Sequence, residues 1–551
     1  MKRTVLCSAA VIALGADAFA ADPEGFDIAY QSIAAADLAR HIETLASDEF
    51  EGRAPGTAGE KKTVAYLIDG FRKAGVGPGV RNSFEQRIPF AEVTRDPDFA
   101  LSLTKDGATS AFKPFDDFVA FAGDAGGKGT IENARLVFAG YGIAAPEYGW
   151  NDYDNLDVDG AIVVLMRGEP MRDGDDAFFM GRELTEHYHM DAKYKLAASK
   201  GAVGAILIHT EESAGWPWSL LQSGGSGAAQ FFLDAEGGGA QLKSSAQISE
   251  PAAKQLFAKA GQDYDALTKA AKEAPGAGRD LGASARLKFD GATRRLKSSN
   301  VVAKIVGRDA PDECVVYTAH WDHIGVNRDA EGDRINNGAL DNATGTAALL
   351  EIAEAYAKLP QAPRRSVYFV ATTAEEKGLF GAKYFADNSP CAPEKTVAVL
   401  NMDSHFPFGS QKAMTIPGFG YSEVQNEFAK AAARIGRVIQ PDSNPEVGGF
   451  FRNDAHPFAQ RGVPAIYAVG SPLDSELTEG SEILGKYIDY VTNKYHKPAD
   501  EYDPASWDMA GLVEDFRIFF DAGLSLAESD LFPNWRYDLP YRATRDRMMA
   551  Q

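Results

Sequence analysis

The sequence predicts an α/β protein with a central mixed, largely parallel sheet flanked by helices, and a smaller, mostly-β domain inserted into it. The last half of the chain alternates short apolar runs with amphipathic segments, which is typical of buried parallel strands joined by helices. The middle of the chain instead contains apolar runs bounded by glycines. At 551 residues the chain is also long enough for two or three domains.

Residues 1–20 are expected to form a secretory signal peptide. Lys2 and Arg3 precede a short apolar run, which ends in the small-x-small cleavage site Ala18-Phe19-Ala20. The run is too short to span a bilayer, and no later stretch is apolar for long enough. We therefore expect an exported protein, periplasmic or secreted, without a membrane span.

Residues 21–132 are expected to begin the larger domain, with two amphipathic helices followed by short strands. Residues 133–290 are expected to form the inserted domain, where ARLVFAGYGI and GAIVVLMRGEP are glycine-bounded strands. Residues 291–551 are expected to complete the larger domain. There the strand-like runs CVVYTAHWDH, SVYFVATTAEE and TVAVLNMDS alternate with helices, and ligand groups in such sheets gather at the carboxyl ends of the strands.

Imidazoles and carboxylates occupy these strand ends and the loops beside them. They are His320, Asp322, Asp341, Glu375, Glu376, Asp403 and His496. Each has an ordinary alternative when taken singly, since Asp341 also suits a helix N-cap and His320 also suits a core histidine. Burying all of them together without a cation would be costly. The set therefore indicates a site for one or two Zn²⁺ ions, which accept imidazole nitrogen and carboxylate oxygen.

Composition narrows the choice of partners. The net charge of −22 argues against a nucleic-acid partner, because phosphate binding requires a basic face. It is compatible with cationic ligands such as metals or free amines. Cys314 and Cys391 remain after the signal, and an oxidising compartment permits a disulfide between them; two buried thiols are the alternative.

Five motifs, HWDH, LDNATG, AEEKG, LNMDS and YHKPAD, resemble in this order the M28 family of co-catalytic zinc aminopeptidases. The segment VFAGYGIAAPEYGWNDYDNLDVDGAIVVL resembles a protease-associated (PA) domain. The resemblance covers nearly the whole chain after the signal. It implies the zinc-exopeptidase fold with an inserted PA domain, which we expect to act as a lid or to guide the substrate.

The resemblance also implies a role for each matching residue. Asp341 would bridge two zinc ions, with His320 and Asp403 completing one site and Glu376 and His496 completing the other. Glu375 would be the general base. Tyr495 would steady the oxyanion, although a plain loop aromatic is the alternative. The side chain of Asp322 would accept the second imidazole N–H of His320 and fix its tautomer.

One loop departs from the family pattern. In GGFFRNDAHPFAQ, Asp454 and His456 are separated by Ala455, where the family usually has Asp-His in succession. Arg452 and Asp454 are candidates for the substrate pocket that this loop lines in relatives. Four other histidines match no ligand position and are expected beside the ligands or on the surface: His187, His189, His323 and His405.

The sequence therefore predicts an exported zinc aminopeptidase that acts on peptides with a free N-terminus. A carboxypeptidase for acidic C-terminal residues would need arginines around the site, and Arg452 is the one found near the motifs. A glutaminyl cyclase of the same fold does not usually need a full two-metal set, and a non-catalytic binding protein need not keep the ligands. In the inserted domain, Trp216 and Trp218 either contact peptide or pack internally.

Overall fold

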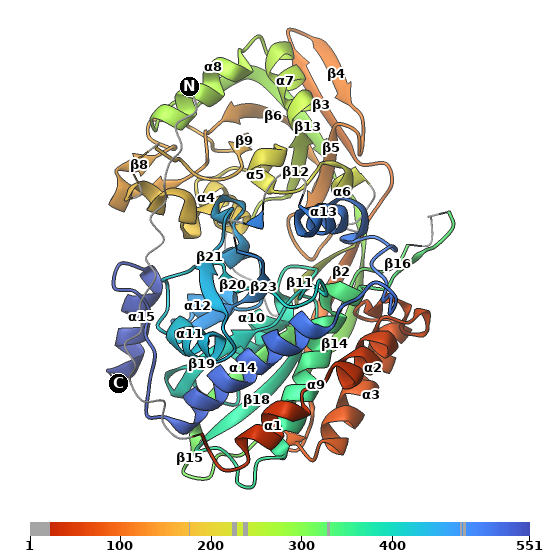
Figure 1. Cartoon of the computed structure of the whole chain (residues 1–551). Coiled ribbons are helices and arrows are strands. Elements are labelled where there is room, and N and C mark those ends of the chain that lie inside the picture. Colours follow the sequence, from red (N-terminus) through yellow and green to blue (C-terminus); the bar gives the residue numbers. More distant parts are fainter. Residues whose placement is uncertain are drawn as a thin grey trace.

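The computed structural model describes residues 22–172, 174–175, 177–222, 229–234, 241–327, 331–473, 476–477 and 481–550. The expected signal peptide, residues 1–20, lies outside these residues. The described chain forms two lobes, each built around an eight-stranded sheet (Figure 1). Within the described residues, no helix combines the length and the apolar character needed to cross a bilayer.

The first sheet has the order β11-β2-β14-β18-β15-β19-β22, with β1 also paired to β14. Strands β18, β15, β19 and β22 run parallel, whereas the strands on the β14 side pair antiparallel. The strands are β1 (Gly77–Pro78), β2 (Glu85–Arg95), β11 (Ala229–Leu233), β14 (Gly291–Ile305), β15 (Ala310–His320), β18 (Arg365–Thr372), β19 (Thr396–Asn401) and β22 (Ala465–Tyr467). The predicted mixed sheet is confirmed, and its parallel half is the part from which the site is built.

Helices cover both faces of this sheet, because successive strand side chains point to opposite sides. Val315 and Tyr317 of β15 pack into one core, and Val316 packs into another. The helices on the first face are α1 (Phe26–Ser32), α2 (Ala35–Leu45), α3 (Ala58–Lys73), α9 (Thr344–Ala357), α11 (Val424–Arg434) and α14 (Ala510–Glu528). Those on the second face are α10 (Phe380–Asp387), α12 (His456–Gln460) and α15 (Pro540–Met549).

The second sheet has the order β4-β3-β13-β6-β9-β10-β12-β5, and β6, β9, β10 and β12 are parallel. Its strands are β3 (Ala100–Lys105), β4 (Ala108–Phe112), β5 (Phe118–Ala122), β6 (Ile131–Phe138), β9 (Ile162–Met166), β10 (Gly204–His209), β12 (Ser244–Ser249) and β13 (Arg279–Lys288). Strands β3 to β5 precede residue 133, so this sheet includes more of the chain than the expected segment 133–290. Its helices are α4 (Met190–Ser199), α5 (Glu211–Ala214), α6 (Ser219–Gln222), α7 (Glu250–Lys259) and α8 (Tyr264–Glu273).

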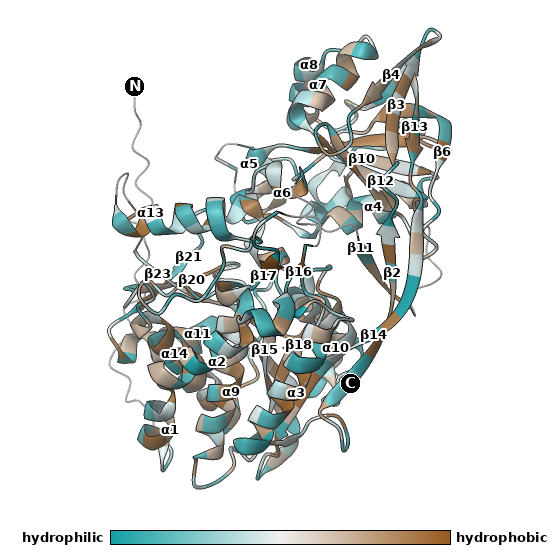
Figure 2. Cartoon of the chain, turned by 90° about the vertical axis from the view of Figure 1, so that its right-hand side faces the viewer, coloured by the Kyte–Doolittle hydropathy of each residue, from teal (hydrophilic) through white to brown (hydrophobic). Residues whose placement is uncertain are grey.

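The two lobes are joined by long strands of the first sheet. Figure 2 shows β14 extending from the first lobe toward the second, with β2 and β11 beside it. Helix α13 (Glu482–Asp489) of the first lobe contributes Leu484 and Tyr487 to a cavity that Trp218, directly before α6 of the second lobe, also lines. The remaining short strands are β7 (Ala144–Ala145), β8 (Trp150–Asn151), β16 (Gly325–Val326), β17 (Ile335–Asn336), β20 (Ala413–Ile416), β21 (Val438–Pro441) and β23 (Val469–Ser471).

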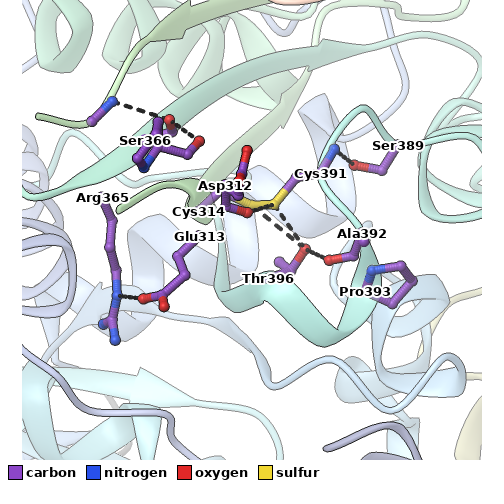
Figure 3. Close-up of a disulfide and its surroundings, with 12 residues drawn as sticks. Asp312, Glu313, Cys314, Arg365, Ser366, Ser389, Cys391, Ala392, Pro393 and Thr396 are labelled. Atoms are coloured by element: carbon purple, nitrogen blue, oxygen red, sulfur yellow. Dashed lines mark hydrogen bonds and ion pairs between the residues drawn. A yellow bond between two sulfur atoms is a disulfide. The ribbon is translucent and has the colours of Figure 1, made fainter. Parts of the chain in front are cut away.

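Cys314 and Cys391 form a disulfide with an S–S distance of 2.04 Å (Figure 3). The sequence leaves open either a disulfide or two buried thiols, and the structure contains the disulfide. It ties β15 to the loop before β19, and Cys314 is fully buried.

Candidate metal centre

The predicted ligand groups meet at the carboxyl edge of the parallel half of the first sheet. In the register of these strands, His320 of β15 lies opposite Thr372 of β18, and Thr318 lies opposite Asn401 of β19. Glu375 and Glu376 therefore follow β18 at the same edge where Asp403 follows β19. This is the edge at which ligands bind in open α/β sheets.

Asp341 lies between two histidines, with one carboxylate oxygen near each. Its Oδ1 lies 3.3 Å from Nε2 of His320, and its Oδ2 lies 3.2 Å from Nε2 of His496. On the first side, His320 Nε2 is also 3.2 Å from Oδ1 of Asp403. On the second side, His496 Nε2 is 3.1 Å from Oε2 of Glu376. The structure thus brings all five predicted ligands together, with Asp341 in the middle.

His323 also belongs to this cluster, although the sequence comparison gave it no ligand role. Its Nδ1 lies 2.7 Å from Oε1 of Glu376, and the side chain is fully buried. This close contact lacks the geometry of a hydrogen bond, and neither ring nitrogen makes another one within the described residues. His323, Asp341 and Glu376 can bring one ligand atom each within 4.8 Å of one another, as can His320, Asp341 and Asp403. The structure therefore offers two overlapping groups of metal-binding side chains that share Asp341.

Asp341 does not cap the helix that follows it. Residues Ala339–Ala343 form a distorted turn before α9, in which Asp341 is extended at φ −108° and ψ 94°. The adjacent Asn342 contacts the first turn of α9 instead, since its Oδ1 accepts the Gly345 N–H at 2.9 Å. Asp500 fixes this turn by accepting the N–H groups of Leu340 at 3.0 Å and Asp341 at 3.1 Å. The carboxylate of Asp341 is consequently free to face the histidines.

Asp322 acts through a different group from the one predicted. The Nδ1 of His320 lies 3.0 Å from the backbone carbonyl of Asp322, whereas the nearest Asp322 carboxylate oxygen is 4.0 Å away. The carboxylate instead accepts the backbone N–H of Glu375 at 3.1 Å. Burial raises the pKa of Asp322 to about 7. Asp322 therefore orients His320 with its main chain and positions Glu375 with its side chain.

Arg53 is a further residue that sequence reasoning missed. It is fully buried and donates hydrogen bonds to the carbonyls of Trp321 at 2.9 Å, Asn337 at 2.6 Å and Gly338 at 2.8 Å. It thereby joins the segment after β15 to the turn that holds Asp341. Burial lowers the pKa of Arg53 to about 10, and the charges of Asp500 and Asp341 oppose that shift.

The electrostatics of the cluster fit a bound cation. Burial alone would lower the pKa of His320, but Asp403 and Glu375 raise it well above its ordinary value. Burial alone would raise the pKa of Asp341, but hydrogen bonds with His320 and His496 hold it well below its usual range. Oε1 of Glu376 is buried, and its close contact with Nδ1 of His323 lacks hydrogen-bond geometry in the described structure. Carboxylates and imidazoles held this close form the donor set that Zn²⁺ accepts.

Two predicted catalytic side chains border the cluster. Glu375 is half-buried. Its burial and the negative charges of Glu376 and Asp403 raise its pKa well above the ordinary value. The ring of Tyr495 stacks on His496 with 3.9 Å between ring centroids. Burial, then Asp341, raises the pKa of Tyr495 well above its ordinary value, so the phenol keeps its proton.

Arg452 and Asp454, the two candidates for the substrate pocket in the loop after β21, differ in burial. Arg452 is exposed, and its charge acts on both Tyr495 and His496. Asp454 is buried and accepts a hydrogen bond from Thr372 at the end of β18, and neither Arg452 nor Asp454 lines the cavity between the lobes.

The other histidines without a ligand role in the motif comparison have protein partners. His405 is buried 2.8 Å from Asp515, and His187 lies 2.8 Å from Glu147. His189 accepts the Asp191 N–H at the start of α4. These contacts account for all three without a metal.

A cavity of about 1960 Å³ lies between the two lobes. Phe406, three residues after Asp403, contributes to its wall from the first lobe, and Trp216 and Trp218 contribute from the second. Tyr467 of β22 also lines the cavity, and it lies opposite Asn401 of β19, two residues before Asp403. The cavity therefore adjoins the cluster, and both tryptophans face it.

The fold and the cluster together define an α/β metalloprotein with a second, mostly-β lobe. Residues 300–519 match the model of peptidase family M28, and residues 132–250 match that of the PA domain. The segment 300–519 belongs to peptidase family M28, a family of zinc metallopeptidases, and residues 132–250 are a PA domain. These matches confirm the resemblance that the motifs indicate.

Known relatives agree with this assignment. A probable zinc metalloprotease of Leptosphaeria maculans is 28% identical over 219 residues, which is 39% of this chain and 50% of the relative. A probable glutamate carboxypeptidase of Arabidopsis thaliana is 33% identical over 163 residues, which is 28% of this chain and 21% of the relative. The chain thus spans half or less of these relatives. The solved structure of an aminopeptidase from Aneurinibacillus sp. strain AM-1 has the same fold, with a TM-score of 0.55, 18% identity and coverage of 92% of this chain and 97% of that one.

Proposed function

We propose that the chain is an exported metallo-aminopeptidase that removes N-terminal residues from peptides with the help of two zinc ions. The observation that supports this proposal is the position of Asp341, which presents one carboxylate oxygen to each of two imidazole–carboxylate groups. His320 and Asp403 would hold one ion, and Glu376 and His496 the other. Bound zinc would acidify a water molecule and polarise the scissile carbonyl.

The protein side chains would perform the proton transfers. Glu375 would take a proton from the attacking water and deliver it to the leaving amine, and its raised pKa suits that exchange. The contact with Asp322 holds the backbone of Glu375 while its side chain moves the proton. Tyr495 would donate a hydrogen bond to the oxyanion.

Preference for a free N-terminus is inferred from the charge at the rim of the centre. Asp403 and Glu375 are both partly exposed, and both are acids. Carboxylates at this position attract the α-ammonium group of a peptide. A carboxypeptidase is the second candidate, because the charge of Arg452 also reaches His496, and the matched Arabidopsis thaliana relative is named as a probable glutamate carboxypeptidase.

The test combines metal analysis of the purified protein with hydrolysis of aminoacyl-anilides. We expect about two zinc ions per chain and activity on free-amine substrates only. Glu375→Ala should keep its metal and lose about 100-fold or more in rate. Glu394→Ala, an exposed acid of the same lobe, is the matched control and should change neither property.

Other outcomes would reject parts of the proposal. A protein that binds no metal, or a Glu375→Ala variant of unchanged rate, would reject the mechanism. Cleavage of N-acetylated peptides that end in glutamate, without anilide hydrolysis, would identify a carboxypeptidase. Export is tested separately, because the mass of the mature protein should correspond to cleavage after Ala20.

A further inference from the structure

The second lobe contributes a wall to the cavity that is built from neighbouring strand ends. Strands β9, β10 and β12 are parallel, with Met166 opposite Ile208 and Ser249 opposite His209. Arg167 follows β9 directly, and His209 is the last residue of β10. Both residues therefore reach the same edge of the second sheet, and both line the cavity.

Arg167 is a positioned cation without an acidic partner. Its Nη2 donates to Oε1 of Gln247 at 2.9 Å, and its Cζ lies 5.6 Å from the ring centroid of Trp216. Its Nε makes no hydrogen bond, and among the described residues no ion pair joins Arg167 to a carboxylate. Burial lowers the pKa of Arg167. A desolvated guanidinium that lacks a counter-charge is costly unless a ligand supplies one.

A second arginine of the same cavity differs from Arg167 because it has a carboxylate partner. Arg182 also lines the cavity, but it is neutralised by Glu446, with Nη2 2.7 Å from one carboxylate oxygen and 2.9 Å from the other. Arg182 therefore has the carboxylate partner that Arg167 lacks.

His209, Trp216 and Trp218 line the same cavity as Arg167. The ring of His209 lies 4.4 Å from that of Trp216 and 5.3 Å from that of Trp218, measured between centroids. Burial, followed by the charge of Arg167, lowers the pKa of His209 to about 4, so the imidazole is neutral at pH 7. Neither of its ring nitrogens has a hydrogen-bond partner in the described structure. A neutral imidazole can donate one N–H to an anion held by Arg167.

A substrate that reaches from the metal centre to Arg167 would lie within one cavity. Its volume of about 1960 Å³ exceeds the range of roughly 300–1,000 Å³ that is usual for small-molecule sites. The same cavity adjoins the metal centre through Tyr467, which lies opposite Asn401 in the sheet, two residues before Asp403. An extended peptide of several residues can therefore contact both lobes at once.

We propose that Arg167, supported by His209 and Trp216, binds a carboxylate of the peptide whose N-terminal residue lies at the metal centre. The favoured substrates are short peptides in which that carboxylate is the free C-terminus. This inference rests on the proposed aminopeptidase function. It makes the second lobe a binding partner for the distal end of the substrate and assigns Arg167 a role in specificity.

The experiment compares trialanine, trialanine amide and the amide of Ala-Ala-Glu as substrates of the zinc-loaded full chain. For Arg167→Gln we expect KM for trialanine to rise by about tenfold or more, because a charge-assisted bidentate contact is lost. The KM for trialanine amide and the kcat for both should stay unchanged. Arg167→Lys should recover part of the loss, since it keeps the charge without the planar fork. Arg182→Gln is the matched control and should show no preference between acid and amide.

Calorimetric binding of trialanine to the zinc-loaded Glu375→Ala variant, with and without Arg167→Gln, measures the subsite without turnover. A loss of affinity for trialanine alone would identify the C-terminal carboxylate, and a loss that extends to the Ala-Ala-Glu amide would identify an acidic side chain. Equal losses for trialanine and its amide, or an equal effect of Arg182→Gln, would overturn the proposal. If the wild type cleaves none of the peptides, the proposed function fails, whereas the calorimetry still decides on the subsite.

Discussion

Asp500 is not one of the predicted ligands, but it shapes the metal centre through the backbone of the turn that carries Asp341. Its two oxygens accept the backbone N–H groups of Leu340 and Asp341, and the Tyr490 hydroxyl lies 3.3 Å from one of them. Burial raises the pKa of Asp500 to about 6. The residue therefore fixes the turn from which Asp341 reaches both sides of the cluster.

We expect Asp500→Asn to weaken zinc binding by about 10- to 100-fold, which is the usual effect of losing a supporting contact around a metal. The amide has one acceptor oxygen, so one of the two backbone N–H groups loses its partner. The measurement is a competition titration against a zinc chelator. Glu501→Gln, the exposed neighbour, is the control, and equal affinities for the two variants would contradict the role of Asp500.

At this scale the sequence predicted five side chains that the structure brings together, because each follows a recognisable strand end or motif. It could not predict which atom of Asp322 turns toward His320, since that depends on the path of the backbone after β15. It also missed Arg53, whose contact with Trp321 joins residues 268 positions apart. His323 was visible in HWDH, but no pattern in the chain itself connects it to Glu376.

Strand β15 connects the centre to the disulfide. His320 ends the strand at the metal centre, and Cys314 lies in its first half, bonded to Cys391 (Figure 3). The bond closes a separation of 77 residues that contains β18, Glu375 and Glu376. The loop that supplies the proposed base is thus enclosed by a covalent link.

Replacing both cysteines by alanine should lower the free energy of unfolding by about 2–4 kcal/mol, because the unfolded chain regains the freedom that the link removes. Urea denaturation of the double variant and the wild type measures this difference. A midpoint equal to that of the wild type would show that the bond adds no stability. The single variants leave an unpaired thiol, so the double variant is the appropriate comparison.

Elements were easier to predict than their pairing. The apolar runs of β15, β18 and β19 predicted parallel strands, and these are parallel. The antiparallel half could not be foreseen, because β2 and β14 are separated by the whole second sheet and meet only in space. The same limit applies to β11, which lies within the segment expected for the inserted domain but pairs with β2.

At the scale of the whole molecule, Glu186 joins the second lobe to the first. It shortly precedes α4 in the chain and contacts α12 on the second face of the first sheet, with Oε1 2.7 Å from Nε2 of His456. Tyr541 of α15 donates a hydrogen bond to the same oxygen, and Gln460 donates to Oε2 at 3.1 Å. Burial alone would raise the pKa of Glu186, but hydrogen bonds and the charge of His456 hold it at about 2.

The lowered pKa of Glu186 predicts that the stability of the fold depends on pH. A carboxylate whose pKa falls from 4.5 to about 2 on folding stabilises the fold above pH 4.5, and that stabilisation is lost as the pH falls toward 2. We expect Glu186→Gln to lower stability at pH 7 by about 1–3 kcal/mol, with a gap that narrows below pH 4.5. Thermal unfolding between pH 7 and pH 3 measures it, with the exposed Glu211→Gln as control. A gap that stays constant over this range would contradict the assignment.

The metal centre depends on segments from almost the full length of the chain. Arg53 meets Trp321, and Asp500 meets Leu340 across 160 positions. Contacts between such distant segments form slowly, because long loops must close before any contact is gained. A nascent chain that ends before Asp500 already contains His320, Asp341, Glu376 and Asp403 but lacks their final geometry. Zinc acquisition by this chain should therefore follow the completion of folding and should not nucleate it.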